Sequence, residues 1–197
     1  YRYDCLTGEI SPLDKFPPPA ASDAVRAVTQ SGERLIVAFG TSGVYSYDLA
    51  EETCSRMPHM PAINILSLCS GSQDILWVGS DGQGIIGIYD DGIAFNKVPN
   101  SRLFDARSCP VRSFYRDAGG NLYVGTKGNG ICMLRPDGTR GAAYDVSRGL
   151  SNNFVYSLAE GYDGDMFIGH DGAGLDVLSF STGRISTVKP AEGARFG

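Results

Sequence analysis

Four copies of one sequence unit make up most of this chain of 197 residues. The clearest copy begins at Val111 and reads VRSFYRDAGGNLYVGTKGNGI. The others read VYSLAEGYDGDMFIGHDGAGL, ILSLCSGSQDILWVGSDGQGI and the shorter VRAVTQSGERLIVAFGTSGV. The last glycines of the four copies are spaced by 41, 46 and 44 residues, at Gly43, Gly84, Gly130 and Gly174. A repeat of about 40 to 45 residues made of strands is typical of β-propeller blades.

Each copy is predicted to contain four antiparallel strands joined by tight turns. In the third copy the predicted strands cover residues 111–116, 121–126, 130–135 and 140–144, and glycine-rich turns separate them. Glycine supplies the positive φ angles that such hairpins need. The predicted fold class is therefore all-β. It is a β-propeller with four complete four-stranded blades, at residues 25–58, 65–99, 111–145 and 155–189.

The first residues match the end of a repeat rather than its beginning. Tyr3-Asp4 resembles Tyr47-Asp48, and Thr7-Gly8 suits a hairpin turn, so residues 1–15 are predicted to be the last two strands of a preceding blade. The stretch 189–197 is too short to supply the two strands that this blade lacks. Because an open ring leaves unpaired strand edges, we expect a single partial propeller domain, 1–197, that is a fragment of a propeller of about seven blades.

Small residues recur where strands are expected to approach closely. The predicted second strand is apolar on both faces, which fits a sheet packed between two neighbouring sheets. It closes on Gly79, Gly125 and Gly169, and on Ala38 in the first copy. The first strand carries a small residue at its third position in all four copies: Ala27, Ser67, Ser113 and Ser157. We expect these residues to let the inner strands crowd around an axis.

Composition excludes several classes of function. The net charge is −5 and no cluster of Lys or Arg is present, so nucleic-acid binding is not expected. No apolar run approaches the ~20 residues that span a bilayer, so this segment is not expected to contact a membrane. Five cysteines and two histidines show no ligand spacing, and no metal is expected. Cys69 and Cys132 fall in predicted strands, where we interpret them as small apolar residues.

Two apparent cofactor motifs are interpreted as hairpin turns. Residues 82–87 satisfy G-x-G-x-x-G, but a predicted strand follows where the dinucleotide fingerprint needs a helix. Asp163, Asp165 and Asp171 lack the twelve-residue calcium-loop pattern with its terminal Glu. His59 and His170 belong to no nucleophile motif. No cofactor and no catalytic residue are predicted.

Candidate ligand-binding residues come from the expected geometry of a propeller. The connections that lead into each first strand, and the hairpins between second and third strands, should gather at one mouth of the central channel, where loops typically bind ligands. The residues expected there are Asp23, Arg26, Asn64, Arg112, Lys127, Asn152, Asn153, Tyr156 and His170. Amides, guanidinium groups and an aromatic ring suit a polar or anionic sugar. The alternative for the arginines is pairing with carboxylates between blades.

The phrases GLSNNFVYSL from Gly149, GNLYVGT from Gly120 and ILWVGS from Ile75 closely resemble the two-component regulator propeller repeat, and the first copy departs from it at Ala38-Phe39. The resemblance covers nearly the whole chain. It implies a periplasmic sensor region of a hybrid two-component system histidine kinase from polysaccharide-degrading gut bacteria. In such proteins two seven-bladed propellers precede a β-sandwich, a membrane helix and the kinase. Related repeats occur in lyases that act on streptogramin-type lactones.

Three functions remain open at this stage. The leading hypothesis is an extracytoplasmic sensor module that binds a glycan-derived oligosaccharide and signals to a kinase elsewhere in the chain, this segment itself not being an enzyme. Its partners would be the remaining blades and downstream domains, and a homodimer through the full-length protein is compatible with it. The alternatives are a lyase-type propeller enzyme, which needs a His and an acid converging at the mouth, and a protein-binding scaffold, which needs a large exposed apolar patch.

Overall fold

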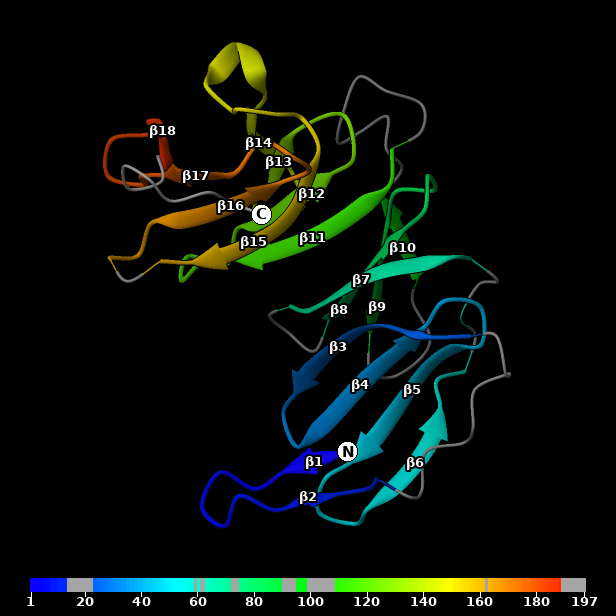
Figure 1. The fold of residues 1–197 in the computed structure, drawn as a ribbon. Coiled ribbons are helices and arrows are strands. Elements are labelled where there is room, and N and C mark those ends of the chain that lie inside the picture. Colours follow the sequence, from blue (N-terminus) through cyan, green and yellow to red (C-terminus); the bar gives the residue numbers. More distant parts are fainter. Residues whose placement is uncertain are drawn as a thin grey trace.

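The computed structural model describes residues 1–13, 23–58, 60, 63–71, 75–89, 95–98, 109–161 and 163–188. Within these residues the chain forms four antiparallel sheets of four strands and one two-stranded hairpin (Figure 1). In every four-stranded sheet, strands that follow each other in the chain are hydrogen-bonded neighbours. The predicted fold class, an all-β partial propeller of four-stranded antiparallel blades, is confirmed.

Four meanders of the same topology form the blades. Blade 1 contains β3 (Val25–Ser31), β4 (Arg34–Phe39), β5 (Gly43–Asp48) and β6 (Thr53–Arg56); blade 2 contains β7 (Ile65–Ser70), β8 (Ile75–Ser80), β9 (Ile85–Tyr89) and β10 (Phe95–Val98); blade 3 contains β11 (Val111–Arg116), β12 (Leu122–Thr126), β13 (Ile131–Leu134) and β14 (Arg140–Tyr144); blade 4 contains β15 (Val155–Glu160), β16 (Met166–His170), β17 (Leu175–Leu178) and β18 (Ile185–Val188). Blade 3 agrees with its predicted strands to within one residue.

The first strands of the blades form the inner side of the arc. β3 lies against β7, β7 against β11 and β11 against β15 (Figure 1). Three apolar clusters fill the spaces between successive blades. Each contains several fully buried members, among them Val78 between blades 1 and 2, Val124 between blades 2 and 3, and Ile168 between blades 3 and 4. Blades 2 and 3 contribute apolar side chains to both neighbours, which explains why their second strands are apolar on both faces.

The recurring small residues have a direct packing role. Ser67, Ser113 and Ser157 are paired across the ladder with Gly79, Gly125 and Gly169, and Ala27 is paired with Ala38. A Cβ atom on any of these three glycines would collide with the Oγ atom of its paired serine. The Ser67 hydroxyl also donates to the carbonyl of Val111 in the next blade, at 3.0 Å. The serines therefore occupy the space that glycine leaves free.

The N-terminal hairpin reproduces the chemistry of an outer blade hairpin. It consists of β1 (Arg2–Tyr3) and β2 (Ile10–Ser11). The Asp4 carboxylate accepts from the backbone amides of Leu6 and Thr7, and Asp48 at the end of β5 accepts in the same way from Ala50 and Glu51. The hairpin approaches blade 1, where Arg2 and Glu52 lie 3.9 Å apart. Its turn thus has the same local geometry as the turn between β5 and β6.

Helical structure is minor in the part of the chain that the structure describes. It is limited there to η1 (Val146–Arg148), a 3-10 turn between blades 3 and 4. No helix within the described ranges has the length and apolar character to cross a membrane. Residues 85–89 form strand β9, so the glycines of the G-x-G-x-x-G match lead into a strand, as the sequence predicted.

Candidate ligand site at the channel mouth

In all four blades the entering connection is hydrogen-bonded to the hairpin between the second and third strands. The backbone amides of Gly40, Asp81, Lys127 and Asp171 donate to the carbonyls of Ala24, Asn64, Pro110 and Phe154, at 3.2, 2.9, 3.0 and 3.1 Å. Neighbouring blades are also tied together here, because the amides of Gly128 and Gly130 donate to the carbonyl of Asn153. These connections and hairpins lie at one end of the blades, here called the mouth.

A β-bulge occurs at the same place in every blade. In each first strand, residues one and three pair with successive residues of the second strand, so residue two is extra. The four extra residues are Arg26, Leu66, Arg112 and Tyr156. Bulges reorient side chains and are common beside functional sites. The sequence selected Arg26, Arg112 and Tyr156 by position but missed Leu66 and the bulge itself.

The bulged residues occupy a row of equivalent positions on the four inner strands, here called the bulge row. In blades 2 and 3 the flanking residues are buried, as Val111 and Ser113 show, whereas the bulged residue is half-buried. Arg26 and Tyr156 are exposed. The guanidinium carbon of Arg112 lies 5.4 Å from the ring centroid of Tyr156, a cation–π contact between blades 3 and 4. Side chains from separate repeats therefore meet on one surface.

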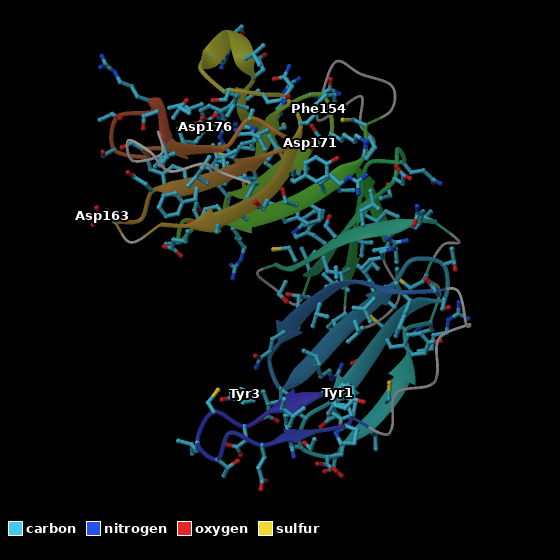
Figure 2. The ribbon with its side chains drawn as sticks, in the orientation of Figure 1. Tyr1, Tyr3, Phe154, Asp163, Asp171 and Asp176 are labelled. Carbon is cyan, nitrogen blue, oxygen red and sulfur yellow. The ribbon has the colours of Figure 1, made fainter. Side chains whose placement is uncertain are left out.

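The junction of blades 3 and 4 combines two cations with two aromatic rings. Lys127 is exposed and forms an isolated β-bridge with Phe154, whose side chain is 39% exposed. Arg112 and Tyr156 lie on the adjacent inner strands, and Nε of Arg112 is buried without a hydrogen-bond partner in the described part of the chain. Figure 2 shows Phe154 beside Asp171, far from Asp163 at the opposite end of blade 4. Phe154 was not among the predicted residues, because as part of the repeat phrase it looked structural.

Four of the predicted residues hold the backbone at the mouth. Asp23 accepts from the amides of Thr41 and Ser42 and from the Thr41 hydroxyl. The Nδ2 atom of Asn64 donates to Asp81, and that of Asn152 donates to the carbonyl of Asp171. The Oδ1 atom of Asn153 accepts from the amide of Val146. These side chains position hairpins and connections around the bulge row.

The carboxyl group of Asp23 is kept ionised by its hydrogen bonds. Ser42 contributes most, and Thr41 adds further hydrogen bonds. Together they hold the pKa of Asp23 well below its usual value, although desolvation acts in the opposite direction. Because the Asp23 carboxylate already accepts several hydrogen bonds, it caps the hairpin and is not a free ligand-binding group.

His170 lies at the end of β16 and is directed into the blade. Its side chain is fully buried, and Nε2 lies 2.8 Å from Oδ2 of Asp176, which is also fully buried. Asp176 further accepts from the amide and hydroxyl of Ser151. The structure therefore does not bring His170 to the surface of the mouth. His59, the other histidine, lies outside the described residues.

The cysteines are not grouped for metal binding in the described part of the chain. All five are free thiols, and no cluster of three metal-ligating side chains occurs among the described residues. Cys132 is fully buried in β13, and burial raises the pKa of its thiol to about 11. Burial also raises the pKa of Cys69. Both thiols behave as small apolar residues, as predicted from their place in strands.

Two cavities of about 330 and 280 Å³ lie away from the mouth. Both are at blade 1 and share Arg34, Asp48 and Met57. The larger one reaches Leu76 and Ile88 of blade 2. None of the nine predicted ligand-binding residues lines either cavity. These two cavities are therefore separate from the predicted ligand-binding residues.

The comparisons with known proteins identify the repeat. Residues 149–172, which include the connection into blade 4, match the family model "Two component regulator propeller". The predicted resemblance to that repeat is thereby confirmed. No curated protein matches the chain.

Solved structures with the same fold include extracellular domains of two-component systems and a lyase. An extracellular domain assigned to the hybrid two-component system BT3049 of B. thetaiotaomicron aligns with a TM-score of 0.67 and 21% identity over 84% of this chain. A second such domain, BT4673, aligns with a TM-score of 0.65 and 21% identity over 85%. A streptogramin B lyase aligns with a TM-score of 0.66 and 16% identity over 82%. The chain spans 22% of each sensor domain and 53% of the lyase.

Proposed function

We propose that this chain is a sensor module of a two-component signalling protein, located in the periplasm, and that it binds a glycan-derived oligosaccharide at the mouth. The observation that carries the proposal is the row of equivalent bulges. All four blades have a bulged residue at the same position of the first strand. Two of these residues in neighbouring blades, Arg112 and Tyr156, are in contact. The similarity to extracellular domains of hybrid two-component systems supports the signalling role.

The chemistry at the junction of blades 3 and 4 suits a sugar that carries a carboxylate or sulfate. The Arg112 guanidinium offers fork-shaped donors for such an anion, and Lys127 adds a second positive charge nearby. Phe154 and Tyr156 are 39% and 37% exposed and offer ring faces for stacking on a sugar ring. A ligand held by both blades would favour one arrangement of the blades over another. That difference in affinity is what a sensor needs to shift an equilibrium.

The test is calorimetric titration of the protein with a carboxylated and a neutral trisaccharide, trigalacturonate and maltotriose. Trigalacturonate is expected to bind more tightly, and Arg112→Ala is expected to weaken its binding about 10- to 100-fold, the value of a charge-assisted hydrogen bond. The matched control is Arg116→Ala, which removes the same charge from the exposed far end of the same strand. Binding of neither sugar, or equal losses in both variants, would contradict the proposal.

A lyase activity is the second candidate, because the structure does bring a histidine and an acid together. His170 and Asp176 form a 2.8 Å pair, but both side chains are sealed from solvent. A general base must reach the proton that it removes. The buried pair therefore favours a structural role, and His170→Ala is expected to leave any turnover of a streptogramin lactone unchanged. Loss of turnover in a correctly folded His170→Ala variant would instead support the enzyme.

A further inference from the structure

Asp176 is an ionisable residue at a position that the other three blades fill differently. In β17 it pairs with Ile168, and the equivalent positions hold Tyr45, Ile86 and Cys132. Its side chain is fully buried. Burying a carboxylate is costly unless its oxygens are hydrogen-bonded or paired. Blade 4 therefore contains a polar group that its own repeat architecture does not require.

Both oxygens of Asp176 have partners from other elements. Oδ1 accepts from the Ser151 hydroxyl at 2.6 Å, and Oδ2 accepts from the Ser151 amide at 2.7 Å and from Nε2 of His170 at 2.8 Å. The Ser151 hydroxyl also lies 2.9 Å from the Thr187 hydroxyl on β18. Because an ionised carboxylate only accepts hydrogen bonds, Nε2 of His170 carries its hydrogen. We call these four residues the Asp176 cluster.

Blades 2 and 3 close the same corner with a purely local contact. The hydroxyls of Ser80 and Thr126, which occupy the position of His170, donate to the carbonyls of Gly84 and Gly130 at 2.7 and 2.8 Å. In blade 4 the His170 backbone amide bonds to Gly174, and the side chain turns to Asp176 instead. In blade 4 the polar side chains of His170 and Asp176 therefore hydrogen-bond toward the connection at Ser151 and do not cap the hairpin between β16 and β17.

The connection held by Asp176 is the one that shapes the mouth between blades 3 and 4. Next to Ser151, Asn152 holds the blade 4 hairpin through the carbonyl of Asp171, and its Oδ1 accepts from the amide of Phe154 at 2.9 Å. Asn153 holds the blade 3 hairpin through the amides of Gly128 and Gly130. Phe154 then bridges to Lys127. Residues 151–154 therefore link both hairpins to the exposed aromatic surface.

We infer that Asp176, with His170, is a positioning residue for the ligand site: it fixes the connection 151–154 and so places Phe154 and Tyr156 opposite Lys127 and Arg112. The inference rests on the proposed function for its biological meaning. Asp176 itself does not touch the ligand, because it is sealed from solvent. Its effect on binding passes through Ser151, whose amide and hydroxyl it holds.

The first test needs no ligand. Amide hydrogen exchange is compared between the protein and Asp176→Asn, which keeps the side-chain size but places an amide donor near His170 and Ser151. Exchange at residues 151–154 is expected to become at least about tenfold faster, while the strands of blade 4 keep their protection. Ser186→Ala, which removes an exposed hydroxyl of β18 outside the Asp176 cluster, is the control and should stay within about twofold. Unchanged exchange at 151–154, or equal acceleration throughout β15 to β18, would overturn the inference in favour of a general core role.

A second variant allows the same test if Asp176→Asn does not fold. If Asp176→Asn loses its cooperative thermal transition, Ser151→Ala removes the donor to Oδ1 and leaves the carboxylate paired with His170. The same local acceleration at 152–154 is expected, and its absence contradicts the inference.

The binding arm uses trigalacturonate and a double-mutant cycle. Asp176→Asn is expected to weaken binding about tenfold in the protein, and to have no further effect once Phe154→Ala has removed the aromatic surface that the connection presents. Additive losses would contradict positioning through residue 154. If the unmodified protein binds no oligosaccharide, the proposed function fails, and the exchange experiment still decides the role of Asp176.

Discussion

Blades 3 and 4 share their backbone register but differ in chemistry at one corner. In blade 3, Thr126 caps its own hairpin and Cys132 fills the space beneath as a small buried thiol. In blade 4, His170 and Asp176 occupy these two positions, and Asp176 accepts hydrogen bonds from His170 and from Ser151. The same strand pairing therefore tolerates either a dry corner or a polar one in which both carboxylate oxygens accept hydrogen bonds. In blade 4 the entering connection supplies donors to this corner, from the amide and hydroxyl of Ser151.

The largest expected effect comes from placing the blade 4 carboxylate in blade 3. Cys132→Asp puts a charge at a fully buried position where the Arg140 side chain is within reach but Thr126 stands in place of His170, and it is expected to lower the free energy of unfolding by about 3 to 5 kcal/mol. Chemical denaturation measures it. Ser186→Asp, at an exposed position of β18, is the matched control and should change stability by about 0.5 kcal/mol or less. A small loss for Cys132→Asp would show that blade 3 also offers carboxylate partners.

The next effect compares the same glycine position in the second strands of blades 3 and 4. In Gly125→Ala the new Cβ meets the Oγ of Ser113 and, at 2.8 Å, a methyl of Val155 in blade 4, so about 2 kcal/mol of stability is expected to be lost. In Gly169→Ala it meets only Ser157, and the expected loss is about 1 kcal/mol or less. Thermal unfolding of the two variants measures the difference. Equal losses would mean that neighbouring blades add nothing to this constraint.

A smaller effect is expected from the blade 3 cap. Thr126→Val keeps the shape but removes the hydroxyl that donates to Gly130 and accepts from Asn129, which is expected to cost about 1 kcal/mol. Thr29→Val, which alters a hydroxyl outside this corner, provides a substitution control. The readout is the unfolding midpoint in urea. No change would mean that the backbone hydrogen bond from Thr126 to Gly130 holds the hairpin unaided.

The smallest expected effect is a difference in stability at acid pH between the protein and the Asp176→Asn variant. Burial raises the pKa of Asp176, but the hydrogen bonds from Ser151, Thr187 and His170 outweigh it, so the pKa lies below the ordinary 3.8. A lowered pKa stabilises the fold at pH values above 3.8, and this contribution is lost as the pH falls through the folded-state pKa. Because the two causes oppose each other, the net slope should be small. Unfolding measured from pH 7 to 3 should show a steeper decline for the protein than for Asp176→Asn, and parallel curves would contradict this.

Much of the fold was predictable from the sequence, because the same four-stranded unit occurs in four copies and each copy predicts the strands of the others. The spacing of Gly84, Gly130 and Gly174 predicts the hairpins, and the paired Ser113 and Gly125 explain why small residues recur. The site was predicted less completely. Sequence position alone selected Arg112 and Tyr156, but nothing in the sequence distinguished them from ordinary strand residues.

The sequence by itself determined the local features of this protein: the strands, the turns and the apolar second strands, all set by side chains and neighbours within one repeat. Only the tertiary structure decided which residues meet across repeats and which polar side chains are buried or hydrogen-bonded within a blade. In the folded protein Arg112 lies over the ring of Tyr156, and the side chains of Asn152 and Asn153 hydrogen-bond to the backbone at the mouth. His170 is buried and paired with Asp176. The physical reason is that such contacts depend on an added bulge residue and on how blades pack. Neither the bulge nor the blade packing leaves a periodic signal in the chain.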